Sequence, residues 1–455
     1  AYSIDAELVE KVILNMKRGK APGFDGLSSE HLQHCHSMLP CVLAKLFNLF
    51  LCCGHVPPQF GHSYTVPLLK SSGCGYSRDL STGDFRGISI SPVLSKVFEH
   101  CILDRFESFF TTSNKQFGFK KNLSCSHAIY TVKSVINHYV AHGSTVNLCA
   151  VDISKAFDNM NHYGLFIKLM DRLLPRSLLL VIEDWFSKCF TCVKWDGIMS
   201  GFFPLTRGVR QGGVLSPYFF AIYINDVVSD IDNKNIGCFL HGTCASIVMY
   251  ADDILLLSPS ISGLQELLRV CEIGLRNLDL SINAKKSVCT RIGPRCNTVC
   301  SNIVSLNGSI IGWSDVVRYL GVYIVRAKQF KCVFNHAKTS FYRSFNAVYG
   351  RIGRAASEEV ILQLIFTKCL PCLLYGVDVC PINKSEQRSF DFSLNRVFMK
   401  LFRTSSMDII QSCKYFFSIP DLMDLVRRRK LNFLSKVISS ENISCQLLRD
   451  SALSE

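Results

Sequence analysis

The sequence predicts an α+β fold: a small antiparallel sheet with helices on one face, followed by a helical C-terminal region. Three observations predict this class. Short apolar runs of strand length flank an acidic pair at 248–257. Another apolar run ends at Asp152 and leads into a helical stretch, and the last third of the chain carries apolar residues at helical spacing. The chain has 455 residues, which leaves room for roughly two to four domains.

The acidic pair lies in the stretch VMYADDILLL. Neighbouring residues within one strand point to opposite faces, so two adjacent aspartates in a strand could not act at one place. We therefore interpret 246–257 as a hairpin with Ala251, Asp252 and Asp253 at or near its tip. Two close carboxylates raise each other's pKa unless a cation lies between them, which indicates a divalent metal site. An ordinary hydrophilic turn is the alternative, because Asp is a common turn residue.

A third acid lies about a hundred residues upstream, in VNLCAVDISKAFDNMNH at 146–162. Its apolar β run places Asp152 at a strand end. A strand-end Asp together with a hairpin pair is the arrangement needed to hold two Mg²⁺ ions, which prefer a few carboxylates plus substrate phosphates. Two such ions can activate an attacking 3′-hydroxyl and stabilise a leaving pyrophosphate.

A glycine loop lies between the two acidic sites, in GVRQGGVLSPYFFAIYINDV at 208–227. Gly212 and Gly213 allow close approach of the backbone, and a glycine loop at a helix start can cradle a phosphate or a nucleotide base. Ser216 and Pro217 are interpreted as the N-cap and first residue of an apolar core helix. Gln211 is placed to contact the nucleotide.

Composition limits the class of protein and its partners. Apolar residues make up 48% and charged residues 19% of the chain, which is typical of a packed globular protein. The net charge of +14 predicts a polyanionic partner such as nucleic acid. No apolar run reaches the length of a membrane span. The 22 cysteines are scattered through apolar runs, which suits a reducing, intracellular compartment, and we expect the nucleus and cytoplasm. Without a signal peptide or initiator Met, the sequence is expected to be part of a longer chain.

Together with further motifs, these stretches resemble the reverse transcriptases of LINE-type (non-LTR) retrotransposons, in the jockey-like or chicken-repeat-like branch. The similarity extends over nearly the whole chain. The stretches that carry it are MKRGKAPGFDGLSSEHL at 16–32, VPLLK at 66–70, DFRGISISPVLSKVFE at 84–99, QFGFKKNLSCSHAI at 116–129, 152–162, 210–217, 250–253, LSINAKKS at 280–287, VRYLGVYI at 317–324 and LPCLLYGVDVC at 370–380.

The resemblance implies a right-hand polymerase. The expected parts are an N-terminal extension and the start of the fingers at 1–65, fingers at 66–145, an antiparallel-sheet palm at 146–325 with part of the fingers interleaved, and a helical thumb with a basic C-terminal region at 326–455. A flexible polar loop is expected at 71–83, within the fingers. The implied reaction is RNA-templated DNA synthesis, primed in this family at a nick in the target DNA. The implied partners are an RNA template, a DNA primer or target DNA, and dNTPs. No membrane partner is implied, and the oligomeric state stays open.

The resemblance also implies catalytic roles. Asp152, Asp252 and Asp253 would bind two Mg²⁺ ions, for which Mn²⁺ is a substitute. Lys286 would protonate the departing pyrophosphate, although the adjacent Lys285 could take this role.

The nucleotide-binding residues follow in the same way. Phe157 would be a steric gate that excludes a 2′-hydroxyl. Lys70 and Arg86 would clamp the triphosphate, and Gln211 and Gly212 would contact the nucleotide. One departure is visible: Gly87 follows Arg86 where the family usually has Pro, so the fingers loop would hold Arg86 less firmly.

The C-terminal region is expected to grip an RNA–DNA duplex. From 326 to 455 there are 20 basic and 11 acidic residues, and phosphate binding requires such a surplus. Pro371 should end or kink a helix. A localisation signal or a solvated face is the alternative for the densest cluster, 426–438. The predicted nucleic-acid contacts are Arg343, Arg351, Arg354, Arg427, Arg428, Arg429 and Lys430.

Two other functions stay open. An RNA-dependent RNA polymerase shares the palm carboxylates, but those enzymes favour Gly before the acidic pair and leave room for the ribose hydroxyl, so Ala251 and Phe157 argue against it. A non-catalytic nucleic-acid-binding remnant would keep the basic thumb and lose the chemistry, and Gly87 is the visible hint of it.

Overall fold

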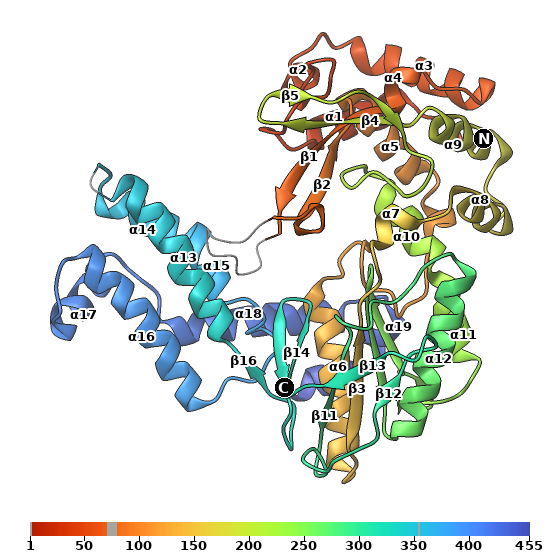
Figure 1. Cartoon of the computed structure of the whole chain (residues 1–455). Helices are drawn as coiled ribbons and strands as arrows, with labels where there is room; N and C mark the ends of the chain where they lie inside the picture. The colour runs from red at the N-terminus through yellow and green to blue at the C-terminus, as the bar shows by residue number, and fades with distance from the viewer. Residues whose placement is uncertain (1, 71–79, 354) are drawn as a thin grey trace. The chain divides into compact units, whose positions relative to one another are not determined.

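The computed structural model describes residues 2–70, 80–353 and 355–455, and the chain forms two compact units (Figure 1). Each unit is assembled from separated stretches of the sequence. Unit 1 consists of Ala1–Ser113, Ile153–Val227 and Ile273–Ser281. Unit 2 consists of Asn114–Asp152, Val228–Glu272 and Ile282–Glu455. Arg354 and most of the predicted polar loop at 71–83 lie outside the described residues; Thr82–Asp84, at the end of that loop, forms a short 3-10 turn.

Unit 1 is built on a sheet in the order β2-β1-β4-β5, with β6 also paired to β4. Strands β1 and β2 form an antiparallel ribbon, whereas β1 and β4 run parallel. The strands are β1 His62–Leu69, β2 Phe85–Ile90, β4 Phe190–Trp195, β5 Ile198–Met199 and β6 Phe203–Pro204. The helices are α1 Ala6–Asn15, α2 Ser29–Gln33, α3 Leu39–Cys53, α4 Pro58–Gly61, α5 Val93–Arg105, α7 Ala156–Asn159, α8 His162–Asp171, α9 Arg176–Ser187 and α10 Ser216–Tyr223, with a 3-10 turn at Glu107–Phe110.

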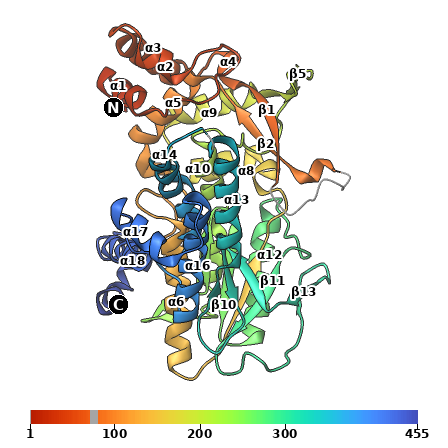
Figure 2. The same cartoon turned by 90° about the vertical axis from the view of Figure 1, so that its left-hand side faces the viewer.

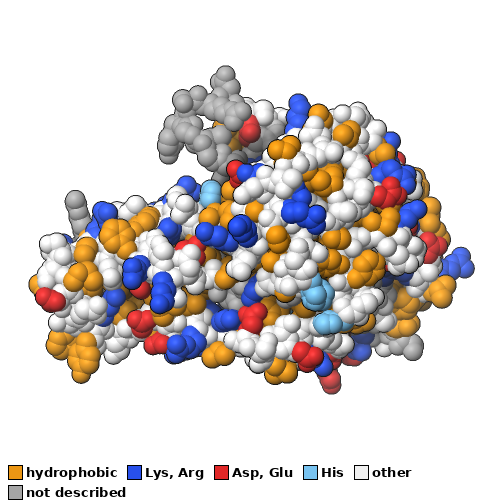
Figure 3. All heavy atoms as spheres, turned by 90° about the horizontal axis from the view of Figure 1, so that it is seen from below, with side chains coloured by type: hydrophobic (Ala, Val, Ile, Leu, Met, Phe, Trp, Pro, Cys, Tyr) orange, Lys and Arg blue, Asp and Glu red, His pale blue; other side chains and the backbone are white. Residues whose placement is uncertain are grey.

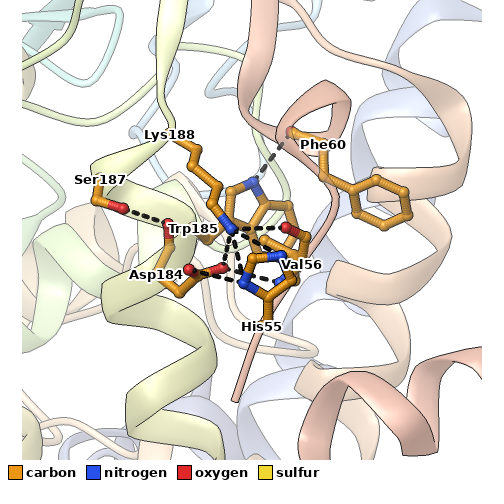
Figure 4. Close-up of polar contacts among 7 residues, drawn as sticks. All are labelled: His55, Val56, Phe60, Asp184, Trp185, Ser187 and Lys188. Atoms are coloured by element: carbon orange, nitrogen blue, oxygen red, sulfur yellow. Dashed lines mark hydrogen bonds and ion pairs between the residues drawn. The ribbon is translucent and has the colours of Figure 1, made fainter. Parts of the chain in front are cut away.

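A polar cluster fixes α9 against the segment before α4 within unit 1 (Figure 4). Asp184 accepts a hydrogen bond from the backbone N–H of Val56 at 2.8 Å and one from Lys188 at 2.6 Å. Lys188 also donates to the carbonyl of Val56 at 2.9 Å, and the Trp185 indole N–H donates to the carbonyl of Phe60 at 3.0 Å. Segments about 130 residues apart in sequence are thereby joined by bonds to backbone groups that packing alone would leave unsatisfied.

Unit 2 is built on a six-stranded sheet in the order β12-β13-β11-β3-β10-β9. Its central pairs are antiparallel, as predicted, whereas β11 and β13 run parallel, so the sheet is mixed at this edge. The reason is that β12 and β13 are added by a long connection after β11, which periodicity does not reveal. The strands are β3 Val146–Val151, β9 Ile247–Tyr250, β10 Asp253–Ser258, β11 Val288–Ile292, β12 Ile303–Val304 and β13 Ile310–Trp313.

Helix α6, Cys125–Ala141, packs against this sheet, in contact with β3 and β9. Its N-cap is Ser124, whose backbone N–H donates to the ring of His127 as in a capping box. Its apolar residues from Ala128 to Ile136 are buried, and they join the inner residues of β3 and β10 in one core. The core therefore lies directly beneath the strands that end at the acidic residues.

The C-terminal part of unit 2 is helical, as predicted. Both views show α16 beside α13 and α17 (Figures 1 and 2). The helices are α13 Asn335–Ile352, α14 Glu358–Leu364, α15 Leu370–Leu373, α16 Lys384–Leu401, α17 Met407–Phe416, α18 Leu422–Ile438, α19 Ile443–Gln446 and α20 Arg449–Ser454. Small sheets precede them: β7 Phe239–Leu240 with β8 Thr243–Cys244, and β14 Val316–Tyr319 with β15 Val322–Val325 and β16 Cys332–Val333. Two helices, α11 Asn225–Asp232 and α12 Ile261–Asn277, have residues in both units.

Pro371 lies in the first turn of α15, directly after a π-helical turn at Ile365–Cys369. Proline has no N–H to donate and its ring crowds the carbonyl four residues earlier, so the helix widens before it. The helix ends at Leu373, close to the proline as expected.

None of the helices in the described ranges is long and apolar enough to cross a membrane. The cysteines in those ranges are free thiols, and most of them are buried or half-buried.

Candidate active site

The acidic pair lies at the tip of a hairpin, as predicted. Strands β9 and β10 are antiparallel, and Asp253 pairs with Tyr250, which leaves Ala251 and Asp252 as the two turn residues. Ala251 is buried and has a positive φ of 57°. A positive φ at the first turn residue matches the twist of a two-residue hairpin, although the residue found there is usually glycine.

Asp152 directly follows β3, also as predicted. Strand β10 pairs antiparallel with β3, and Ile254 lies opposite Val151, so Asp253 and Asp152 emerge at the same end of neighbouring strands. The backbone N–H of Asp152 donates to the hydroxyl of Ser287 at 3.1 Å, and its carbonyl accepts from Asn283 at 2.7 Å. The buried Ser287 hydroxyl in turn donates to the carbonyl of Asn283 at 2.9 Å.

The electrostatics of this sheet end show that the three carboxylates interact. The pKa of Asp253 is raised to about 6, first because surrounding protein displaces water from its charged form, and then because of the negative charges of Asp252 and Asp152. The Asp253 side chain still reaches solvent. The positive charge of Arg318, on β14, opposes the rise. Like charges are therefore held near one another at a cost in free energy.

These carboxylates fit a divalent cation by their chemistry. They are hard oxygen ligands whose mutual repulsion a cation would relieve. Across residues 2–70, 80–353 and 355–455, no three acidic, His or Cys side chains already form a group that could enclose a metal ion.

Lys286 is exposed in the turn that leads into β11. Its backbone N–H donates to the carbonyl of Asn283 at 3.1 Å, and Asn283 bonds Asp152. The backbone carrying Lys286 is therefore tied to the backbone of Asp152. Lys285 is exposed in the same turn, so this geometry does not distinguish the two lysines.

Unit 1 contains the predicted nucleotide-binding residues. Arg86 lies in β2 opposite Leu68 of β1, and the backbone N–H of Lys70 bonds the carbonyl of Asp84 at 2.8 Å. Since cross-strand partners share a face and alternate residues return to it, Lys70 and Arg86 point to one face of the ribbon. Both side chains are exposed. Gly87 lies within β2, paired with Pro67, and not in a loop as expected.

The glycine loop packs on β2 in the same unit. The carbonyl of Gln211 accepts a bond from the Ser89 N–H at 2.8 Å, and the Gln211 side chain donates to Asp158 at 3.0 Å. Gly212 has a φ of 134°, and a Cβ there would lie 2.4 Å from the carbonyl oxygen of Ser89. Only glycine fits such a close approach of two backbones.

The helix after this loop begins one residue earlier than predicted. Leu215 is the N-cap of α10, Ser216 is its first residue and Pro217 its second. The buried carboxylate of Glu99, on α5, accepts hydrogen bonds from the backbone N–H groups of Val214 and Leu215. A tertiary contact thus replaces the local serine cap.

Phe157 is half-buried in α7, and its ring stacks on Phe220 of α10 with centroids 4.5 Å apart. The carbonyl of Phe157 accepts a bond from Val209 at 2.9 Å. The ring is therefore held against α10 and the backbone of Phe157 is bonded to Val209, while the side chain stays partly exposed.

The predicted nucleic-acid contacts lie on two helices of unit 2. Arg343 and Arg351 are exposed on α13, and Arg427, Arg428 and Arg429 are exposed on α18; Arg354 is outside the described residues. Arg429 also donates to the carbonyl of Leu374 at 3.2 Å, and Lys430 pairs with Glu455 at 3.0 Å. On the face drawn in Figure 3, basic side chains are spread among apolar ones and do not gather in one patch.

The family model for reverse transcriptase (RNA-dependent DNA polymerase) matches residues 70–324, more than half of the chain. The chain belongs to the reverse transcriptase family. The match runs from Lys70 to beyond Lys286, so every predicted catalytic and nucleotide-binding residue lies inside it. The predicted family and its polymerase fold are thereby confirmed.

Curated relatives of this reverse transcriptase chain come from retrotransposons. It is 27% identical to the RNA-directed DNA polymerase from mobile element jockey of Drosophila melanogaster, over 83% of this chain and 41% of that protein. It is 24% identical to the Pol polyprotein of the type-2 retrotransposable element R2DM of Drosophila melanogaster, over 69% of this chain and 29% of that protein. The chain spans less than half the length of these relatives. The predicted LINE-type origin agrees with them.

Among solved structures, apo telomerase from Candida tropicalis, truncated from its C-terminal domain, is similar at 14% identity and a TM-score of 0.41. The alignment covers 61% of this chain and 56% of that chain.

The structure of this reverse transcriptase chain adds three buried polar residues that the sequence analysis did not assign. Glu99 caps α10, Ser287 bonds the backbone of Asp152, and Gln116 bonds the hairpin turn at Ala251. Each lies within or at the end of a stretch that carries the family resemblance. Their position in these stretches could have marked them as candidates for a role near the site. It does not reveal which backbone groups their side chains bond.

Proposed function

We propose that this chain synthesises DNA on an RNA template by adding dNTPs to the 3′ end of a DNA primer. The observation that carries the proposal is the placement of Asp152, Asp252 and Asp253 at one end of the buried sheet of unit 2, within the reverse transcriptase match. Buried strands fix the positions of these acids, and a two-metal polymerase needs carboxylates at fixed positions.

Asp152, Asp252 and Asp253 would hold two Mg²⁺ ions, or Mn²⁺ as a substitute. Bound there, such ions supply Lewis acidity for the attacking 3′-hydroxyl and charge stabilisation for the leaving pyrophosphate. The chain itself contributes fixed positions for the carboxylates. Lys286 would give a proton to the pyrophosphate oxygen, from a turn whose backbone is bonded to that of Asp152 through Asn283.

The residues of unit 1 would bind and select the nucleotide. The side chains of Lys70 and Arg86 share one exposed face of the β1–β2 ribbon, where cations can pair with phosphate oxygens. Phe157, stacked on Phe220, would leave no room for a 2′-hydroxyl and so favour dNTPs over rNTPs. Gln211 and Gly212 would approach the nucleotide through the loop that packs on β2.

The nucleic-acid partners would be an RNA template and a DNA primer, and the primer would be a nick in target DNA. Support comes from the net charge of +14 and from the exposed arginines of α13 and α18. Arg427 and Arg428 are better candidates for phosphate contact than Arg429 and Lys430, which already bond Leu374 and Glu455.

The experiment is incorporation of dTTP or UTP on a poly(rA)–oligo(dT) duplex with Mg²⁺, beside an Asp252→Ala control. Incorporation of dTTP that disappears in the control supports the proposal. Preference for UTP would instead indicate an RNA polymerase, and duplex binding with no incorporation by the folded wild-type chain would indicate a non-catalytic remnant.

Substituting the gate residue tests the selection step separately. Phe157→Val should raise UTP incorporation relative to dTTP by about ten-fold or more, since it removes a steric clash worth a few kcal/mol. Phe220→Leu, which alters the ring beneath Phe157, serves as the matched control and should change the ratio less. An unchanged ratio in Phe157→Val would refute the gate.

A further inference from the structure

The segment before α6 lies along β9 as an added edge. Gln116 forms a parallel bridge with Met249. The N–H of Phe117 donates to the carbonyl of Met249 at 2.8 Å, and the N–H of Met249 donates to the carbonyl of Lys115 at 2.9 Å. This places Gln116 beside the last residues of β9, next to the turn that carries the acidic pair.

The Gln116 side chain bonds both backbone groups of one turn residue. Its Oε1 accepts from the N–H of Ala251 at 2.9 Å, and its Nε2 donates to the carbonyl of Ala251 at 3.3 Å. Oε1 also accepts from the N–H of Gly118 at 2.9 Å. Gln116 is 2% exposed, so these bonds form away from water, where losing a partner is costly.

Ala251 needs such a partner. It is buried and has a φ of 57°, a conformation that a residue with a Cβ adopts only at an energetic cost. Buried backbone groups must also be hydrogen-bonded. A carboxamide offers one donor and one acceptor, which matches the C=O and N–H of a single residue.

The same segment fits tightly against the turn at Gly118. A Cβ at Gly118 would lie 2.6 Å from the backbone nitrogen of Ala251 and 3.1 Å from Gln116 Oε1. Glycine at this position therefore lets the segment approach closely enough for the amide of Gln116 to reach both groups of Ala251.

We propose that Gln116 is a positioning residue of the polymerase reaction: it holds the Ala251–Asp252 turn, and so fixes the carboxylates of Asp252 and Asp253 relative to Asp152. The inference rests on the proposed function. Gln116 does not touch the reacting groups, but it fixes the backbone on which two of the three acids stand. A small displacement of catalytic groups costs large factors in rate.

The test compares Gln116→Met with Asn147→Leu. Methionine keeps the length and volume of Gln116 but neither donates nor accepts at Ala251. Asn147 is a buried amide on β3, at the end of the β3–β10 pair that is far from the acidic residues. It donates there to the carbonyl of Ser258 at 3.1 Å. Its replacement disturbs the β3–β10 pair without touching the turn, so it controls for a general loss of stability.

Hydrogen exchange tests the tether independently of activity. The tether is the pair of hydrogen bonds between the Gln116 side chain and the backbone of Ala251. In Gln116→Met, backbone amides of a peptide covering 247–253 should exchange at least about ten-fold faster, because a buried bond to Ala251 is lost. In Asn147→Leu this peptide should be unaffected. Unchanged exchange in Gln116→Met would overturn the tether, whatever the activity.

Kinetics then report the consequence. We expect kcat of Gln116→Met to fall about ten-fold or more, with the KM for the poly(rA)–oligo(dT) duplex within two-fold of wild type. Asn147→Leu should keep kcat per folded molecule. Faster exchange with unchanged kcat would overturn the positioning role. If the wild-type chain does not polymerise, the proposed function fails, while exchange still decides whether the tether exists.

A second pair of variants tests the same hydrogen bonds, and Gln116→Glu takes the place of Gln116→Met in the exchange measurement if Gln116→Met does not fold. Glycine at position 251 adopts a positive φ without cost, so Ala251→Gly added to Gln116→Met should recover part of the lost kcat. Gln116→Glu keeps the acceptor but loses the donor, and should fall between wild type and Gln116→Met in hydrogen exchange. Absence of recovery together with wild-type exchange in Gln116→Glu would contradict the proposal.

Discussion

The acidic end of the sheet in unit 2 and the cationic end of the β1–β2 ribbon in unit 1 are built in opposite ways. Asp152 and the Asp252 turn stand on strands with buried inner residues and are each bonded by a buried side chain, Ser287 or Gln116. Lys70 and Arg86 stand at the exposed end of the β1–β2 ribbon, and their side chains reach solvent.

The difference shows how each charge is held. The carboxylates repel one another, as the raised pKa of Asp253 shows, so their positions must be imposed by the surrounding structure. The cations can adjust to a phosphate as it arrives, since long exposed side chains sample several rotamers. We expect substitutions at the acidic end to act mainly on kcat, and those at the ribbon mainly on KM.

The largest effect should come from Asp253→Asn. Losing one carboxylate should lower kcat by about 10³-fold or more, because a metal-bound transition state is stabilised by several kcal/mol. The same change removes a repulsive charge, so thermal stability should stay equal or rise. A fall in Tm together with full polymerase activity would contradict the view that mutually repelling carboxylates are held at this end of the sheet for catalysis.

Arg86→Gln should raise the KM for dNTPs by about ten-fold, with a smaller change in kcat. A change of this size is expected when one charge-assisted hydrogen bond to the nucleotide is lost. Steady-state kinetics at varied dTTP measure both. Arg176→Gln is the matched control, because Arg176 is an exposed arginine of the same unit, at the start of α9. If Arg86→Gln changed only kcat, the ribbon would behave like the acidic end, and the proposed difference between the two regions would be wrong.

Ser287→Ala should lower kcat several-fold, since the backbone N–H of Asp152 loses a hydrogen bond worth about 1 kcal/mol. The KM should stay near that of wild type. Thr290→Val is the comparison variant: Thr290 is also buried, on β11, and its hydroxyl has no hydrogen-bond partner within the described ranges. Equal losses in both variants would mean that the hydroxyl of Ser287 has no special role.

The smallest effect on activity should come from Asp184→Asn, which lies in the polar cluster of unit 1 (Figure 4). Burial alone would raise the pKa of Asp184, but hydrogen bonds from Lys188 and Val56 lower it below its ordinary value of 3.8. Because the folded pKa is depressed, this stabilisation is present above about pH 4 and is lost as the pH falls through the folded pKa.

At pH 7, Asp184→Asn should therefore be less stable by about 1 kcal/mol, and its stability should fall less steeply below pH 4. Denaturant unfolding at several pH values measures both, with the exposed Asp171→Asn as control. An identical pH profile in wild type and variant would show that this cluster does not contribute.

By itself, the sequence determined the local elements and the acids that they carry. The apolar runs around Asp252 and Asp253 and the strand that ends at Asp152 were predicted correctly, because strand and turn preferences depend on neighbouring residues. The order of the motifs along the chain was enough to predict the family, which the match to residues 70–324 confirms.

Only the tertiary structure decided which distant side chains hold those elements. Gln116 is separated from Ala251 by 135 positions, and Ser287 from Asp152 by the same number. Glu99 replaces the predicted Ser216 cap from 116 positions before Leu215, and a parallel partner for β11 makes the sheet mixed. Such hydrogen bonds depend on where the chain returns in space, and a buried polar group is satisfied by whichever side chain the packing brings to it.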